Sequence, residues 1–316
     1  MSVQWYLKGP GTWSVSLCSI LTCVLLMVVY LKDKKTYTVF TLYVVLIGIC
    51  GAAKTLMEQA TFIQEGILFR SMPDWLIDVR AFTLTSYYWF LYETIAGMMD
   101  LLVAADCMNR YLVICRPEDK DAFLKKKITA LVITVVVIVS CTFAGFVAKM
   151  ETHVDAMWNQ EKSLNPALYD DDSGYLWIVT IAFESIVSIL LCGFHVVFTV
   201  RTYLTLKKSI AFLVQSNAGA ATERILVYRK LIHFSCTILA NVLLFNFALK
   251  VGEQGFVWLI HAEANMYWSS VYGNGLDRDR YGWQKTFWDE LKYALKMILC
   301  LKPCCYNAAY IWLKWK

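Results

Sequence analysis

The sequence predicts an all-α membrane protein, folded as a bundle of seven transmembrane helices. Of its 316 residues, 58% are hydrophobic and 17% are charged, whereas a soluble domain usually has about 45–50% and about 25%. The apolar residues collect in runs of about 18 or more, which is long enough for a helix to cross a hydrocarbon core about 30 Å thick. The Lys and Arg residues lie in short clusters between these runs.

Each run is predicted to form one membrane span, and the spans are residues 14–31, 36–57, 81–113, 128–148, 175–204, 226–250 and 285–312. The third, fifth and seventh spans are long for a bilayer, so we expect them to tilt or to extend beyond it. Residues 255–272 are also moderately apolar, but they contain His261, Glu263 and Asn265, so we assign them to an outer loop. Residues 1–316 contain no internal repeat and no Pro- or Gly-rich linker, which indicates one domain.

The positions of the basic residues predict an amino terminus outside the cell and a carboxyl terminus inside. Short loops that are rich in Lys and Arg stay in the cytoplasm. Such clusters follow the first, third and fifth spans and end the chain, and they include Lys34, Lys35, Arg116, Lys125, Lys126, Lys127, Lys207, Lys208, Lys314 and Lys316. The opposite loops are acidic or balanced, as at Asp170-Asp171-Asp172. This orientation requires an odd number of spans and places the chain as a multi-pass protein in the lipid bilayer of the plasma membrane.

The composition argues against several other classes of protein. The net charge of +5 is modest, and no basic run is interleaved with exposed aromatic residues, so we expect no nucleic-acid partner. All eleven cysteines lie inside or at the ends of apolar runs, which argues against a disulfide framework. The four histidines are scattered and lack metal-ligand spacing. We therefore expect no metal, no cofactor and no enzymatic activity.

Two motifs lie at the predicted inner ends of spans three and seven. The first reads Asp106-Cys-Met-Asn109-Arg110-Tyr111-Leu-Val-Ile-Cys115-Arg116-Pro117 and resembles the Asp-Arg-Tyr signature of rhodopsin-like (class A) G-protein-coupled receptors. The second, Leu301-Lys302-Pro303-Cys304-Cys305-Tyr306, resembles the same family's Asn-Pro-x-x-Tyr motif. The resemblance implies a receptor that transmits an extracellular signal to a heterotrimeric G protein, with Asn109, Arg110, Tyr111, Pro303 and Tyr306 as its switch residues.

The chain also departs from that family. Asn109 stands where the family has an acidic residue next to the signature Arg, and Asn cannot hold Arg110 by charge. Glu223 at the start of span six is therefore a candidate partner for Arg110. Thr85 stands where the family has its loop cysteine, and Lys302 replaces the Asn of the second motif. Such departures resemble those of invertebrate orphan or chemosensory receptors. A simpler interpretation of Arg110 is also open, because an Arg at the inner end of a hydrophobic helix can serve as a plain topology anchor.

Charged residues inside the predicted spans are functional candidates, because an unpaired charge in hydrocarbon costs at least about 2.5–3.5 kcal/mol. Span three carries Glu93, Asp100 and Asp106, and span seven carries several lysines. We predict that Lys302 pairs with Asp106 or with Asp100, where relatives in the family hold a sodium ion. A buried ion pair without a signalling role is the alternative.

The outer halves of spans three, five and seven, with Asn246 of span six, are predicted to form a ligand pocket. Helical spacing and the family analogy point to aromatic walls with a few polar anchors, namely Tyr88, Trp89, Tyr92, Glu93, Ala96, Glu184, Asn246, Trp288, Lys292 and Lys296. Ordinary helix packing is the alternative for each aromatic residue. The ligand is expected to be a small molecule or a peptide, and free lysines would favour one with a carboxylate.

Two other functions are compatible with the sequence. A transporter or channel would use the intramembrane charges as a pathway, although the internal repeats and broken helices typical of transporters are not evident. A retinal-binding, opsin-like photoreceptor would use Lys296, which lies seven residues before Pro303, as opsins place their Schiff-base lysine. The missing loop cysteines and span-six Trp argue against this second alternative.

Overall fold

The structure, a computed structural model, describes residues 11–32, 39–63, 74–119, 125–163, 171–215, 221–252, 291, 294–295 and 297–314. These residues form α2 (Thr12–Leu31), α3 (Val39–Ile63), α4 (Asp74–Cys115), η4 (Pro117–Asp119), α6 (Lys126–Ser163), α7 (Asp171–Gln215), α8 (Ala221–Val242), η5 (Leu243–Leu249) and α11 (Lys302–Lys314). The described residues are nearly all helical and none lies in a strand. The predicted all-α class is confirmed.

Five helical segments are long and apolar enough to cross a membrane. They are Trp13–Leu31, Val39–Met57, Lys126–Gly145, Ala182–Gln215 and Thr222–Gly252, and they correspond to predicted spans one, two, four, five and six. Predicted span three lies within α4, where Glu93, Asp100, Asp106 and Arg110 interrupt the apolar character. For predicted span seven, the structure describes a continuous segment only from residue 297 onward. The membrane character of the chain is thus supported by five helices.

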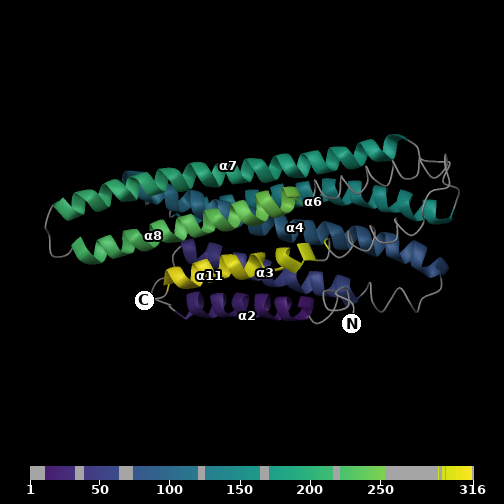
Figure 1. The fold of residues 1–316 in the computed structure, drawn as a ribbon, viewed down its shortest axis with the longest axis horizontal. Helices are drawn as coiled ribbons and strands as arrows, with labels where there is room; N and C mark the ends of the chain where they lie inside the picture. The colour runs from purple at the N-terminus through teal and green to yellow at the C-terminus, as the bar shows by residue number, and fades with distance from the viewer. Residues whose placement is uncertain are drawn as a thin grey trace.

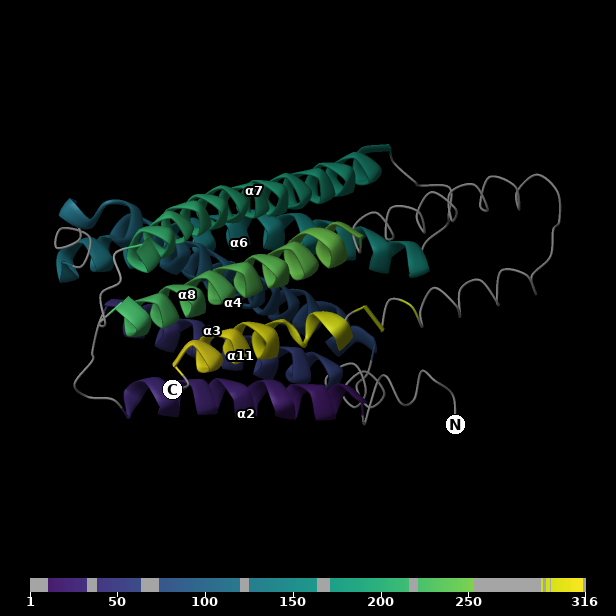
Figure 2. The ribbon, with the colours of Figure 1, turned by 60° about the vertical axis from the view of Figure 1, so that its left-hand side comes forward.

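The helices lie side by side in an elongated bundle (Figures 1 and 2). Consecutive long helices run in alternating directions, so that the ends at Leu31, Cys115, Gln215 and Lys314 gather at one end of the bundle, marked C in Figure 1. The α4 helix packs against α3, α6 and α7, while α11 packs against α2, α3 and α8. Three basic residues lie near these helix ends along the chain: Lys125 directly precedes α6, Lys207 lies eight residues before the end of α7, and Lys314 is the last residue of α11.

The outward faces of the helices are strongly apolar. Leu131 of α6 is 63% exposed and Leu190 of α7 is 67% exposed, and many further Leu, Val and Ile side chains point outward. In water such a surface would be an aggregation liability, whereas in lipid it needs no cover. The buried core lies between the helices and includes Leu26, Tyr43, Ile47, Met99, Leu102 and Tyr306.

The contact between α2, α3 and α11 depends on a small residue. A Cβ atom at Gly51 of α3 would lie 3.2 Å from Cys23 Sγ and 3.3 Å from Pro303 Cβ. Pro303 itself lies in the first turn of α11, directly after a turn at Cys300 and Leu301. Because Pro lacks a backbone N–H and crowds the preceding turn, it favours a break in the helix at this point. The close approach of Gly51 brings α11 deep into the bundle.

Candidate functional site

Arg110, near the carboxyl end of α4, is held by a carboxylate one turn earlier on the same helix. Its Nε donates a hydrogen bond to Asp106 Oδ2 at 2.8 Å, and the side chains of Arg110 and Asp106 are 14% and 1% exposed. Residues four apart lie on the same face of a helix, so the pair follows directly from the spacing. Asp106 is therefore the acid that holds Arg110, and Glu223 lies exposed in the first turn of α8. The suggestion of Glu223 as the partner is wrong.

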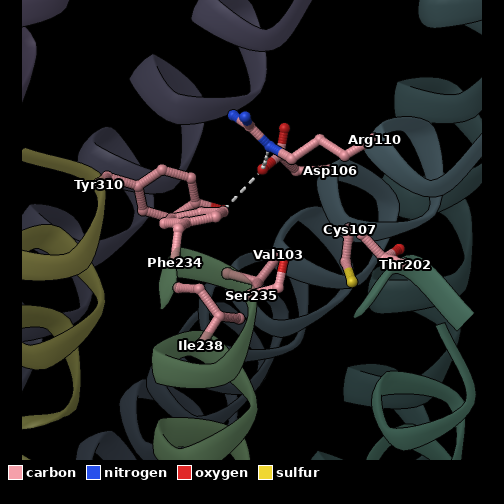
Figure 3. A pocket seen from close by; sticks show the side chains of 9 residues that line it. All are labelled: Val103, Asp106, Cys107, Arg110, Thr202, Phe234, Ser235, Ile238 and Tyr310. Carbon is pink, nitrogen blue, oxygen red and sulfur yellow. Dashed lines mark hydrogen bonds and ion pairs between the residues drawn. The ribbon is translucent and has the colours of Figure 1, made fainter. Parts of the chain in front are cut away.

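Other helices close around this pair. The hydroxyl of Tyr310 in α11 donates to Asp106 Oδ2 at 3.0 Å, and the hydroxyl of Tyr30 in α2 donates to the backbone carbonyl of Tyr310 at 3.0 Å. Figure 3 shows Arg110 and Tyr310 converging on the carboxylate of Asp106. The bond from Tyr310 means that a single carboxylate oxygen joins α4 to α11.

The guanidinium of Arg110 also lies against two aromatic rings. Its Cζ is 4.7 Å from the ring centre of Phe40 in α3 and 5.0 Å from that of Phe234 in α8. Such cation–π contacts are worth about 0.5–2 kcal/mol each, more when water is excluded. We call Phe40, Asp106, Arg110, Phe234 and Tyr310 the Arg110 cluster. It brings together side chains from α3, α4, α8 and α11.

A second set of charges lies closer to the other end of α4. Lys302 Nζ is 2.7 Å from Asp100 Oδ1 and 2.8 Å from Asp100 Oδ2. Lys302 is 6% exposed and is the first residue of α11, where the helix dipole disfavours a positive charge. Asp100 offsets both this effect and the cost of burial. The choice that the sequence left open, between Asp106 and Asp100, is settled in favour of Asp100.

Charges on α3, α4 and α7 and at the end of η5 extend this pair into a network. Lys250, next to η5, lies 3.8 Å from Glu184 of α7. Glu93 interacts electrostatically with Lys54, Asp100, Glu184 and Lys250. We call these residues, with Lys302, the central charge network, which contains three carboxylates and three ammonium groups, with ion pairs between Lys250 and Glu184 and between Lys302 and Asp100. The Lys54 ammonium also lies 5.7 Å from the ring centre of Tyr92.

Of the predicted pocket residues, the structure brings Tyr92, Glu93 and Glu184 into this network. Ala96 is half-buried on α4, and Asn246 is buried in the π-helical turn η5. Trp288, Lys292 and Lys296 lie outside the described residues, as do the side chains of Tyr88 and Trp89. The predicted pocket and the retinal hypothesis for Lys296 therefore stay predictions.

The predicted switch residues occupy different surroundings. Tyr111 packs on Phe198 with ring centres 4.8 Å apart, and its hydroxyl accepts a hydrogen bond from Arg201 at 3.4 Å. Asn109 and Tyr306 are buried, at 6% and 0% exposure. Within the described part of the chain, Asn109 Nδ2 and the Tyr306 hydroxyl have no hydrogen-bond partner. The structure thus groups Arg110 with Asp106 and Tyr310 rather than with Asn109 and Tyr306.

Sequence reasoning missed five residues of these two sites, namely Lys54, Lys250, Phe40, Phe234 and Tyr310. Lys54 and Lys250 are charges within or at the end of predicted spans, so the cost of a charge in hydrocarbon was a signal that could have found them. Phe40, Phe234 and Tyr310 gave no such signal, because aromatic residues are common in apolar helices. Only packing identifies them as neighbours of Arg110.

We found no protein-family model that matches this chain, and no curated protein matches it.

Proposed function

We propose that this chain is a receptor of the seven-transmembrane, G-protein-coupled type, with its amino terminus outside the plasma membrane and its carboxyl terminus inside. Five apolar helices of spanning length support a membrane location. The gathering of basic residues at one end of the bundle supports the orientation. The resemblance of the Arg110 and Pro303 motifs to those of rhodopsin-like receptors supports the class.

The observation that carries the proposal is the Arg110 cluster. An arginine that only anchored a helix in the membrane would extend to water and lipid phosphate. Arg110 instead is 14% exposed and is enclosed by side chains from α3, α8 and α11 as well as by Asp106 of its own helix. The guanidinium of Arg110 is thus enclosed inside the bundle, and a movement of the surrounding helices would expose it.

Signalling then is a shift between two arrangements of the inner end. In the closed one, Tyr310 and Phe234 hold α11 and α8 against α4 through Asp106 and Arg110. In the open one, Arg110 is free to meet a G protein. A ligand favours the open arrangement only to the extent that it binds that arrangement more tightly.

The central charge network connects the ligand-binding end of the bundle to the Arg110 cluster at the inner end, so that ligand binding at one end affects the other. Asp100 precedes Asp106 by six residues, or about 9 Å along α4, and its partner Lys302 lies on the same helix as Tyr310. A ligand that draws Glu93, Glu184 or Lys250 out of the network changes the electrostatic environment of the Asp100–Lys302 pair. A ligand with charged groups fits this role.

The test is basal second-messenger signalling by Tyr310→Phe in cells that express a panel of G proteins. This variant removes one hydrogen bond of the closed arrangement and keeps the ring against Phe234. We expect a basal rate about fivefold higher, the factor that corresponds to a loss of about 1 kcal/mol. Tyr203→Phe on the exposed face of α7 is the matched control, and surface expression is measured for both.

Arg110→Ala in the same assay should abolish signalling at equal surface expression. Unchanged basal signalling in Tyr310→Phe would contradict the proposal. If the purified chain in liposomes then moved ions across the bilayer, the transporter or channel alternative, which the six charges of the central network also favour, would replace the receptor.

A further inference from the structure

The outward face of α7 carries an apolar stripe that is open along its length. Leu190, Val197 and Leu204 recur every seven residues, which is nearly two helical turns, so they share one side of the helix. Their side chains are 67%, 51% and 50% exposed. Gly193 lies between the first two, and a Cβ atom there would meet no described atom within 4 Å. In a membrane this stripe lies against lipid chains.

Two basic residues continue the same side of α7 toward its carboxyl end. Arg201 precedes Leu204 by three residues and Lys208 follows it by four, so the three positions share one side of the helix. Arg201 and Lys208 are both exposed. Arg201 also reaches the neighbouring helix, because its Nη1 donates a hydrogen bond to the hydroxyl of Tyr111 in α4 at 3.4 Å. The stripe therefore ends in two cations, one of them held beside α4.

The length of the helix puts these two cations at the depth of the lipid headgroups. The apolar segment Ala182–Gln215 has 34 residues and is about 51 Å long, whereas the hydrocarbon core is only about 30 Å thick. When Ala182 lies at one edge of the core, Arg201 lies about 28 Å further along the helix, near the other edge, and Lys208 lies about 10 Å beyond it. Leu190 comes about 16 Å before Arg201, which is about the thickness of the core in one leaflet.

The charge at this end of α7 is positive. From Val200 to Gln215 the helix carries Arg201, Lys207 and Lys208 and no acidic residue. Among the residues that the structure describes, no carboxylate forms an ion pair with Arg201 or Lys208. A negatively charged group complements this part of the surface.

We propose that this face of α7 binds an anionic phospholipid from the leaflet at the end marked C in Figure 1. The lipid phosphate lies at Arg201, whose guanidinium matches the geometry of phosphate oxygens. A further negative group of the headgroup lies at Lys208, which is farther from the core, and one acyl chain lies along Leu190, Val197 and Leu204. Basic residues beside a membrane span attract anionic lipids in this way. The inference rests on the membrane location and stands whether or not the chain is a receptor.

The test is photo-cross-linking of the full chain in nanodiscs of phosphatidylcholine that contain a minor fraction of phosphatidylserine with a diazirine on its acyl chain. Mass spectrometry of the peptides should locate the label on α7 around Val197 and Leu204. The double variant Arg201→Gln, Lys208→Gln should lower this labelling at least about fivefold, because each basic residue near an anionic surface contributes about that factor to binding.

The matched control is the double variant Arg224→Gln, Arg229→Gln, which removes two positive charges from exposed positions of α8. It should leave the labelling of α7 unchanged. An equal fall in this control would mean general attraction of anionic lipid to a basic protein, and it would overturn the proposal.

Two further comparisons use the wild-type chain and so do not depend on how the variants fold. Phosphatidylcholine with the same diazirine should label the stripe severalfold less than phosphatidylserine does, and equal labelling would mean unselective contact with lipid. Free glycerophosphoserine, the headgroup without acyl chains, should compete weakly. Complete competition would identify a soluble anion as the ligand instead of a membrane lipid, and either result would overturn the proposal.

Discussion

At the scale of single residues, the bundle separates its charges into two groups along α4. Asp106 serves Arg110, and Asp100 serves Lys302. Asp100 follows Glu93 by seven residues, nearly two full turns, and so shares its helix face, whereas Asp106, six residues further on, lies about 120° around the helix from Asp100. Asp106 meets Arg110 one turn further along its own helix, whereas Asp100 meets Lys302 of the neighbouring helix α11.

Reversing the Asp100–Lys302 pair should be tolerated, whereas reversing either charge alone should not. Asp100→Lys or Lys302→Asp leaves two like charges buried together, and losing one partner of a buried pair costs about 3–5 kcal/mol. Each single variant should therefore lose most of its surface expression, and the double variant should recover it. A carboxylate at position 302 would also be favoured by the amino end of α11.

Surface expression is measured by antibody labelling of intact cells against total protein. Glu118→Lys, a charge reversal at an exposed residue of η4, is the control and should express normally. If the double variant expresses no better than the single ones, the direct pairing is refuted.

At the scale of elements, α11 is the piece that joins the two groups of charges. It begins with Lys302, which pairs with Asp100, and eight residues later Tyr310 reaches Asp106. Its position depends on close packing against α2 and α3, where Cys304 lies 3.1 Å from the Ser19 hydroxyl and Asn307 donates to Cys23 at 3.0 Å. A shift in the position of α11 therefore affects both the Asp100–Lys302 pair and the Asp106–Arg110 pair.

Gly51→Val should disturb the packing of α11 against α2 and α3 and destabilise the bundle. The added Cβ would lie 3.2 Å from Cys23 Sγ and 3.3 Å from Pro303 Cβ, and overpacking of this kind typically costs about 1–3 kcal/mol. Thermal unfolding of the purified variant in a fixed detergent measures the effect.

Gly193→Val is the control, since a Cβ at Gly193 meets nothing within 4 Å. Replacing a helical glycine by a residue with better helix propensity should leave its stability equal or slightly higher. Equal stability of the Gly51 and Gly193 variants would show that α11 moves aside without cost and that its packing does not require a small residue at position 51.

At the scale of the whole molecule, the apolar outer surface and the basic end of the bundle place the protein in a membrane. The helices alternate in direction, so we expect the helix ends at the end marked C in Figure 1 to lie on one side of the bilayer. We expect that side to be the cytoplasm, because the clusters around Lys126 and Lys207 are there.

Glycosylation acceptor sites added one at a time test the predicted topology. A site fused before Met1 should be glycosylated, and a site after Lys316 should remain unmodified. A site inserted within 255–272 should be modified if this segment is the predicted outer loop. Both ends of the chain on one face of the membrane would mean an even number of crossings and would end the receptor proposal.

The sequence by itself determined the class of the fold, because helix length and apolar character are local properties that can be counted along the chain. It also identified Arg110, Asp100, Asp106 and Lys302 as charges that need partners, since burial of an unpaired charge is costly wherever it occurs. Only the tertiary structure decided that Lys302 pairs with Asp100, that Arg110 contacts Phe40 and Phe234, and that Lys54 and Lys250 lie within electrostatic reach of Glu93. Those choices depend on the rotation and depth of each helix against its neighbours, which are set by the packing of all the side chains together.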